Sequence, residues 1–498
     1  MVPSRTLGPA EVWGHAPLMP SGRGLGAMPP RNPPVGQGIG GMAPENPPTA
    51  RRVSQGAALP NLEIHPMTLF KNFRLGLLHV AVAITLVPIS GVLNRIMIHE
   101  MGIWATIVAG LIILPPLLSP LQPILGQYSD HHPLFGYRRT PYIVLGFILC
   151  ISGAMLTPLG ALAMDESFFP GFFFALGAFF MWGLGYNLAV VSYLSLASDL
   201  SDEGRSSRTI AIMWFMMLCG VITTAILTGI ALDDYSSEQL VRVFFIAGMV
   251  SFTLATLGIV GLEPRNAKKP TEKRHSFREA IGTVIGNPHA RVFFVYLIML
   301  LSAIMGQDVL LEPFGAAAFD MSVRETTQLT AFWGAATMVA LLLQGVLFSR
   351  FMTKKTGATM GALIAVAGFF LIALSGVLAF QPLFVPGIIV LGFGTGIATT
   401  TNLAMMLDMT TPTNVGLYIG AWGVADATAR GLGNVMAGVV RDIITHTVGS
   451  PVIGYTTVFM LEGTILCAAL LLLRRIDVSA FRSEQQSMTT LIAVAADA

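Results

Sequence analysis

A polar stretch, GQYSDHHPLFGYRRTPY (126–142), separates two apolar runs that are each long enough to cross a membrane. An acid, a turn glycine and two arginines in one short loop are costly at a bilayer surface unless their charges bind the two helices together. We therefore expect this segment, the clamp loop, to hold its two helices in place. The residues expected to do so are Gly126, Asp130, Gly136, Arg138 and Arg139.

The composition is that of a protein embedded in a bilayer. Hydrophobic residues make up 53% of the chain and the mean hydropathy is +0.69. Charged residues make up 11%, against roughly 25% in ordinary soluble domains. The formal net charge of +2 argues against a nucleic-acid partner. Cys150, Cys219 and Cys467 are too dispersed for a disulfide framework or a metal cluster, so we expect them to serve packing.

Apolar runs of the length that a spanning helix needs, about 20 residues, recur twelve times along the chain. They cover residues 74–94, 102–126, 142–164, 168–196, 209–232, 240–262, 291–312, 328–349, 358–380, 383–407, 415–440 and 453–473. Basic residues such as Arg205, Lys268 and Arg474 lie in the loops of one side, and acids such as Asp165 and Asp233 lie on the other. Because basic loops stay in the cytoplasm, we expect both termini to be cytoplasmic.

The apolar runs fall into two groups of six. We expect an N-terminal six-helix bundle over 66–262, a cytoplasmic linker over 263–290 and a C-terminal six-helix bundle over 291–475. Residues 1–65 are rich in Pro and Gly and contain no apolar run, so we expect a disordered cytoplasmic tail and no secretory signal. Residues 476–498 are expected to form a second cytoplasmic tail.

The two halves show weak internal similarity. YLSLASDLSDEG aligns with NLAMMLDMTTPT, so Asp199 corresponds to Asp408. The clamp loop recurs as GVLFSRFMTKKTG, with Ser349 in place of Asp130. Because the second copy lacks the acid, we expect its clamp to be weaker than the first.

Charged residues inside the apolar runs require a partner or a function, since each costs roughly 2.5–3.5 kcal/mol at the centre of a membrane helix. Asp308 and Glu312 lie one turn apart in the 291–312 run. Aligning the first run with this one places Arg95 opposite Asp308. We expect an ion pair between Arg95 and Asp308 that bridges the halves and either stabilises the fold or binds a substrate.

The 415–440 run combines charges with a stripe of small residues. Asp426 and Arg430 form an i, i+4 pair with the acid first, the favourable order. The small residues share one face of the helix and comprise Gly416, Gly420, Gly423, Ala427, Gly431, Asn434 and Gly438. Such a face serves either tight helix packing or the approach of a flat ligand. Glu462, in the last run, is a lone acid for which the sequence predicts no partner.

His79 is the one histidine that lies within an expected spanning helix. Neutral imidazole is a good ligand for the magnesium of a chlorophyll, although a lone buried histidine more often serves packing. The sequence contains no Walker loop, nucleophile elbow or HExxH motif, and no other site for a metal is expected. We therefore do not expect the chain to be an enzyme.

Three segments resemble known families. The clamp loop resembles the GxxxDxxGRR loop of the major facilitator superfamily, with three extra residues before Gly136. Together with LNRIMIHE (93–100) and QDVLLEPFG (307–315), the stretch QPILGQYSDHHPLFGYRRTPY (122–142) resembles the PucC/LhaA family of light-harvesting-complex assembly proteins of photosynthetic bacteria.

This resemblance implies an all-α polytopic membrane protein with the major facilitator fold, in the bacterial inner or intracytoplasmic membrane. It implies a protein that supplies or inserts (bacterio)chlorophyll during assembly of photosynthetic light-harvesting complexes. No covalent cofactor is expected. The expected partners are (bacterio)chlorophyll or a precursor, antenna polypeptides and the lipid bilayer.

Two mechanisms are compatible with the sequence. A pigment carrier would hold a chlorin and transfer it to antenna helices. A proton-coupled secondary transporter of a small solute would instead use Arg95, Asp308, Glu312, Asp426 and Arg430. The shortage of polar groups near the middle of the membrane favours the first mechanism, and an enzyme of pigment synthesis ranks last.

Overall fold

Helices are the regular elements of the described chain. The computed structural model describes residues 66–201, 206–265, 288–410 and 415–476, together with Gly282 and Gly286. The expected tails at 1–65 and 476–498 lie outside the described residues, apart from Ile476, and so does most of the expected linker at 263–290.

The first half of the described chain contains α1 (Pro66–Val87), the π-helices η1 (Pro88–Leu93) and η2 (Ile96–Glu100), α2 (Ala105–Ile112), α3 (Leu114–Leu118), the short 3-10 turn η3 (Ser119–Leu121), α4 (Gln122–His131), α5 (Thr140–Glu166), α6 (Phe168–Leu200), α7 (Ser206–Ala231) and α8 (Ser237–Ile259). The second half contains α10 (Pro288–Phe319), α11 (Val323–Val346), η4 (Phe348–Arg350), α12 (Lys354–Val377), η5 (Gln381–Leu383), α13 (Phe384–Asp408), α14 (Val415–Val448) and α15 (Pro451–Arg474).

Ten helices of the described chain are long and apolar enough to cross a membrane, and an eleventh span is formed if α2 is joined with α3 and α4. The axis bends by 41° between Ala105–Ile112 and Leu114–His131. Pro115 and Pro116 lie at this bend, and proline bends a helix because it removes a backbone hydrogen bond and clashes with the preceding turn.

The expected twelfth span coincides with α14. This helix has 34 residues and is therefore about 50 Å long at 1.5 Å per residue, more than a bilayer requires. Asp426, Arg430 and Asn434 lie in its middle among several glycines, and they make it too polar to qualify as a span by hydropathy. The structure thus shows ten or eleven spans in its described part, and the expected count of twelve is not reached.

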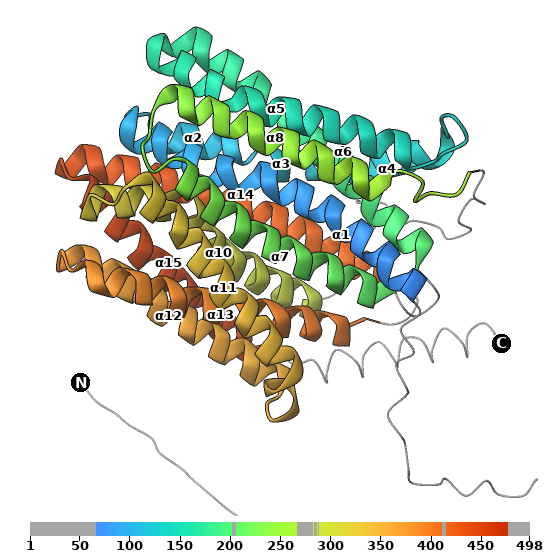
Figure 1. The fold of residues 1–498 in the computed structure, drawn as a ribbon. Helices are drawn as coiled ribbons and strands as arrows, with labels where there is room; N and C mark the ends of the chain where they lie inside the picture. Colours follow the sequence, from blue (N-terminus) through green and yellow to red (C-terminus); the bar gives the residue numbers. More distant parts are fainter. Residues whose placement is uncertain are drawn as a thin grey trace, which may run out of the picture. The chain divides into compact units, whose positions relative to one another are not determined.

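Helix pairs pack through glycines in both halves (Figure 1). α5 packs along α6, and α12 packs along α13. A Cβ added at Gly368 of α12 would lie 2.6 Å from the backbone nitrogen of Leu391 in α13, and one at Gly153 of α5 would meet the backbone of Trp182 in α6. Only glycine allows backbones to approach so closely.

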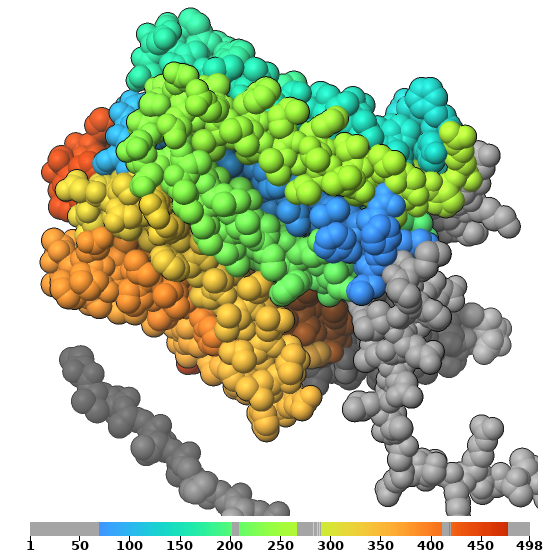
Figure 2. Space-filling view, viewed as in Figure 1, coloured from blue at the N-terminus to red at the C-terminus, as the bar shows by residue number. Residues whose placement is uncertain are grey.

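Contacts also connect the elements before and after residues 263–290. α7 packs against α11, and α14 packs against α2 and α3. α1 packs between α7 and α8 and is visible at the surface as a narrow strip between them (Figure 2). The division into two six-helix bundles and the cytoplasmic location of the termini stay predictions.

Candidate functional site

The clamp loop encloses one of its two arginines completely. Arg139 is fully buried, forms an ion pair with Asp130, and donates to Ser129 Oγ at 2.5 Å and to the Gly126 carbonyl at 3.2 Å. Gly136 has a φ of +80°, in the region that glycine occupies without strain. The structure therefore joins the end of α4 to the start of α5 through a buried guanidinium.

Two acids from other helices complete this clamp. Arg138 donates to Asp199 Oδ2, at the end of α6, at 2.8 Å, and Arg139 lies 3.8 Å from the same carboxylate. Glu263, directly after α8, accepts the backbone N–H groups of Arg138 at 2.9 Å, Arg139 at 3.0 Å and Thr140 at 2.7 Å. A carboxylate at a helix N-terminus accepts hydrogen bonds from the free N–H groups of the first turn. Its negative charge also interacts favourably with the positive end of the helix dipole. Glu263 is not predicted as a clamp residue from the sequence, where its only signal is an acid directly after an apolar run.

A second, simpler clamp lies at the corresponding place in the second half. Lys354 Nζ lies 2.6 Å from Asp408 Oδ2 at the end of α13, as Arg138 lies beside Asp199. Lys355 donates to the carbonyls of Arg474 at 3.1 Å and Ile476 at 2.8 Å. These carbonyls lie at the end of α15 and accept hydrogen bonds from the start of α12. In the first half, the Glu263 carboxylate after α8 accepts hydrogen bonds from the start of α5. The alignment of Asp199 with Asp408 is thus supported by the contacts.

The expected ion pair between Arg95 and Asp308 is wrong. Arg95 binds Glu100 at 2.7 Å within its own segment and donates to the carbonyl of Met321 at 3.0 Å. Arg95 follows η1 and precedes η2, and each π-helical turn contains more residues than an α-helical turn. This change of register rotates Arg95 away from the face that an alignment of regular helices assigns to it.

Asp308 instead joins the pair on α14. Arg430 Nε donates to Asp426 Oδ2 at 2.9 Å, and Arg430 Nη1 lies 3.7 Å from Asp308 Oδ2. Gln307 donates to Asp308 Oδ1 at 2.6 Å. The side chains of Arg430, Asp426 and Asp308 are 39%, 33% and 29% exposed, so this group is partly buried. With two acids and one arginine, it has an excess negative charge between α10 and α14.

Glu312 is buried against the first span. Thr330 donates to Glu312 Oε1 at 2.6 Å. A Cβ added at Gly91, in η1, would lie 2.6 Å from the same oxygen. Asn94 donates to the Val309 carbonyl at 2.7 Å. The π-helical segment therefore places a glycine and an amide against α10, and π-helical turns are frequent at functional sites.

Asp442 connects α14 to α2 at the end of the bundle opposite the clamp loop, which we name the far end. Its carboxylate accepts from the backbone N–H of Ala105 at 3.2 Å, the N–H of Thr106 at 2.8 Å and the Thr106 hydroxyl at 2.7 Å. Arg441 donates to Asp442 at 2.8 Å and to the Tyr455 hydroxyl at 3.2 Å. Asp442 is not predicted as a contact residue from the sequence, because it lies just beyond the expected 415–440 span.

Further polar contacts join the two predicted halves at the far end. Arg324, at the start of α11, lies 2.8 Å from Asp233, just after α7. The bond from Arg95 to Met321 also crosses between the halves. Together with the contacts of Asp442, these bonds hold the far end together.

The glycine face of α14 serves packing over part of its length. A Cβ added at Gly431 would lie 2.9 Å from Ile113 Cδ1, and one at Gly438 would lie 2.9 Å from the backbone of Ala105. A Cβ added at Gly423 would meet no atom within 4 Å. The small-residue face of α14 therefore serves helix packing at Gly431. At Gly423 the face is open, which leaves the space that a flat ligand would require.

His79 belongs to α1, and its ring packs against Tyr193 of α6 and Trp214 of α7. It is almost completely buried, and its Nδ1 has no hydrogen-bond partner in the described part of the chain. Its ring centroid lies 5.3 Å from Tyr193 and 5.3 Å from Trp214. The Trp214 ring is 50% exposed and thus covers the imidazole from the surface of α7. An unpaired imidazole between aromatic rings has the chemistry of an axial ligand to chlorin magnesium.

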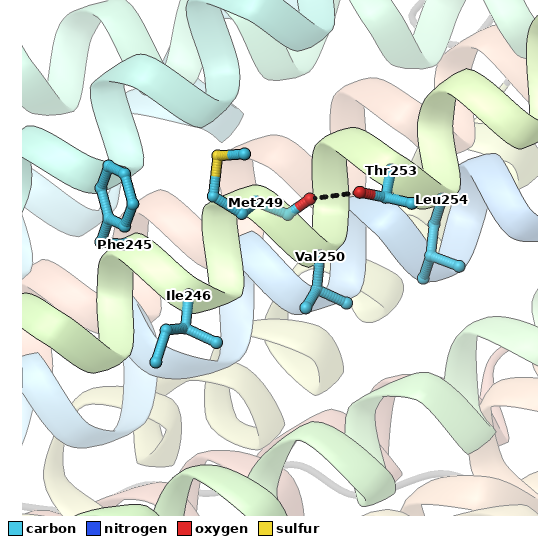
Figure 3. A pocket seen from close by; sticks show the side chains of 6 residues that line it. All are labelled: Phe245, Ile246, Met249, Val250, Thr253 and Leu254. Carbon is cyan, nitrogen blue, oxygen red and sulfur yellow. Dashed lines mark hydrogen bonds between the residues drawn. The ribbon is translucent and has the colours of Figure 1, made fainter.

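A shallow groove of about 300 Å³ lies on the outward face of α8 (Figure 3). Its lining comprises Phe245, Ile246, Met249, Val250, Thr253 and Leu254. The Thr253 hydroxyl donates to the Met249 carbonyl at 2.8 Å in the same helix, so the groove offers an apolar wall. This apolar wall suits contact with hydrocarbon chains and presents few hydrogen-bonding groups to a water-soluble molecule.

Comparisons with known proteins agree with this architecture. A family model described as PUCC protein matches residues 92–481. Protein PucC of Rhodovulum sulfidophilum is 32% identical over 392 residues, which are 76% of this chain and 86% of that protein. The bacteriochlorophyll synthase 44.5 kDa chain of Rhodobacter capsulatus is 26% identical over 380 residues, 75% of this chain and 87% of that protein.

The fold is similar to that of solved membrane transporters. A bacterial homolog of the human lysosomal transporter Spinster superposes with a TM-score of 0.64 at 13% sequence identity, covering 82% of this chain and 97% of that chain. The expected fold, an all-α multi-pass membrane protein of the major facilitator type, is thereby confirmed.

Proposed function

The chain belongs to the PUCC family, and on this premise we propose that it binds a (bacterio)chlorophyll or a precursor in the membrane and supplies it to antenna polypeptides as light-harvesting complexes assemble. The relative named as a bacteriochlorophyll synthase chain supports a role with this class of pigment. A chlorin is apolar and already dissolves in lipid, so a binding site for it requires a lipid-accessible entrance and a ligand for magnesium.

The observation that supports pigment binding is the environment of His79. Its Nδ1 is buried without a hydrogen-bond partner among the described residues, so an incoming metal would meet little competition for the imidazole. Of the two rings packed against the imidazole, Tyr193 is fully buried and Trp214 lies at the surface. Trp214 is half exposed, and a pigment would enter from the lipid when this ring turns aside. When bound, the chlorin would contribute its light-absorbing ring system, and the chain would orient it.

A second function, proton-coupled transport of a small solute, is favoured by one observation. Asp308, Asp426 and Arg430 form a partly exposed charged group between α10 and α14 in a fold that transporters share. This group would bind a polar solute, whereas the His79 site would not. The two functions therefore depend on different residues and can be separated by mutation.

The pigment proposal is tested in the organism that encodes the chain. Deletion should lower assembled antenna complexes several-fold in membrane absorption spectra while pigment synthesis continues. Complementation with His79→Leu should fail to restore them, whereas His446→Leu, a control at the far end beside Trp104, should succeed. Normal antenna levels in the deletion strain would refute the function. Full complementation by His79→Leu would refute the role of His79 alone.

A further inference from the structure

A carboxyl group in α15 is buried without any partner. Glu462 has an exposed fraction of 0%, and neither Oε1 nor Oε2 has a hydrogen-bond partner among the described residues. α15 packs against α10, α12 and α14, so the group lies where several helices meet. An isolated, ionised carboxylate is strongly disfavoured in the interior of a helix bundle, because burying an unpaired charge costs many kcal/mol.

The carboxyl lies in a slot between α10 and α14. A Cβ added at Gly306 of α10 would collide with Glu462 Oε1 and would lie 3.3 Å from Glu462 Cδ. The same Cβ would lie 3.2 Å from the carbonyl of Gly433 in α14. Glycine at 306 therefore makes the room that the carboxyl occupies, and glycine at 433 lets α14 approach the backbone of α10 beside it.

Other buried oxygens near this slot also lack partners. Ser302 lies one turn before Gly306, Gln307 follows Gly306, and Asn434 follows Gly433. Ser302 Oγ, Gln307 Oε1 and Asn434 Oδ1 have no hydrogen-bond partner among the described residues. These atoms accept hydrogen bonds, and of the three only the Ser302 hydroxyl can also donate one. The turns of α10 and α14 that flank the slot thus contain unpaired oxygens and, among these atoms, no cation.

The charged groups around the slot do not neutralise a carboxylate. Asp308 of α10 acts on Glu462 electrostatically and has the same sign. Asp426 and Arg430 of α14 bind each other. From α12, the ring of Phe370 and the Cβ of Phe369 approach the neighbouring Gly463. No arginine or lysine of the described chain forms an ion pair with Glu462, since all the ion pairs found there involve other acids.

We propose that Glu462 is a proton-binding site, in which the carboxylate takes up one proton and becomes a neutral carboxylic acid. A proton fits better than a metal cation, because a hard cation requires six or more oxygens arranged around it and the slot is closed by the Gly306 backbone. This site is distinct from His79 and does not depend on pigment binding.

Infrared spectroscopy of the purified full-length protein in lipid nanodiscs tests the proposal. At neutral pH the wild type should show a carboxylic-acid C=O band that Glu462→Gln lacks. The matched control is Glu238→Gln, which removes a carboxylate whose side chain is 85% exposed on α8, and it should keep the band. Identical carboxylic-acid bands in the wild type and Glu462→Gln would show that Glu462 is ionised and would overturn the proposal.

Two further measurements keep the test decisive. If the Glu462→Gln variant does not fold, the Gly306→Ala variant is measured instead. The added methyl group at position 306 would displace the Glu462 carboxyl and should shift the frequency of its carboxylic-acid band. An unshifted band would contradict the placement of the acid in the slot.

Thermal unfolding with and without Na⁺ separates a proton from a metal cation. Stabilisation by Na⁺ in the wild type but not in Glu462→Gln would assign the site to a cation and overturn the proposal.

Discussion

Glu263 should be one of the most important polar residues for the stability of the clamp. Its carboxylate accepts from the backbone N–H groups of Arg138, Arg139 and Thr140 and from the Thr140 hydroxyl. Loss of a side-chain cap costs about 0.5–2 kcal/mol, and hydrogen bonds to a charged group contribute about 1.5–3 kcal/mol each. Because water at the membrane surface can replace part of these bonds, we expect Glu263→Ala to lower the free energy of unfolding by about 2–4 kcal/mol.

Glu263→Gln should cost less, about 1–2 kcal/mol, because the amide keeps one accepting oxygen while losing the charge that favours a helix N-terminus. The assay is unfolding of the purified protein by SDS in mixed micelles, followed by tryptophan fluorescence. Amide hydrogen exchange at residues 138–140 should accelerate in both variants. Glu238→Gln, an exposed change on α8, serves as the control. If Glu263→Ala unfolds within about 0.5 kcal/mol of the wild type with unchanged exchange, the capping role is refuted.

Three further predictions use the same unfolding assay. Asp442→Asn should destabilise the protein by about 1–2 kcal/mol, because it removes the charge from the bonds to the start of α2; wild-type stability would contradict this role. A double-mutant cycle on Lys354 and Asp408 should give a coupling free energy below about 1 kcal/mol, since both side chains are partly exposed. A coupling free energy above about 2 kcal/mol would contradict a weak second clamp. Gly431→Leu should cost about 1–3 kcal/mol through its collision with the Ile113 side chain, directly after α2, whereas Gly423→Leu should leave stability unchanged. Equal effects would refute the difference in packing.

The contacts that the sequence predicts correctly are those formed within one segment. The clamp loop places Asp130 and Arg139 nine residues apart, and the pair between Asp426 and Arg430 follows from helical spacing. Charge and turn chemistry within a short stretch therefore suffice to predict both contacts. The fold class follows in the same way from the length of the apolar runs.

The contacts that the sequence does not predict cross long stretches of chain. Glu263 reaches the start of α5 and Asp442 reaches the start of α2, and neither acid differs in its local sequence from an ordinary loop residue. Arg95 was assigned to the wrong partner because two π-helical segments alter the helix register. These segments contact α10, and the periodicity of one helix does not predict where a π-helical turn occurs.

The most direct test of pigment binding is an absorption spectrum of the full-length protein purified in mild detergent from its native membrane. Our account predicts chlorin absorbance that remains with the folded protein, is lost in His79→Leu and is kept in His446→Leu. A stable wild-type protein without pigment, which takes up a water-soluble solute when reconstituted into vesicles, would contradict the account and favour the transporter.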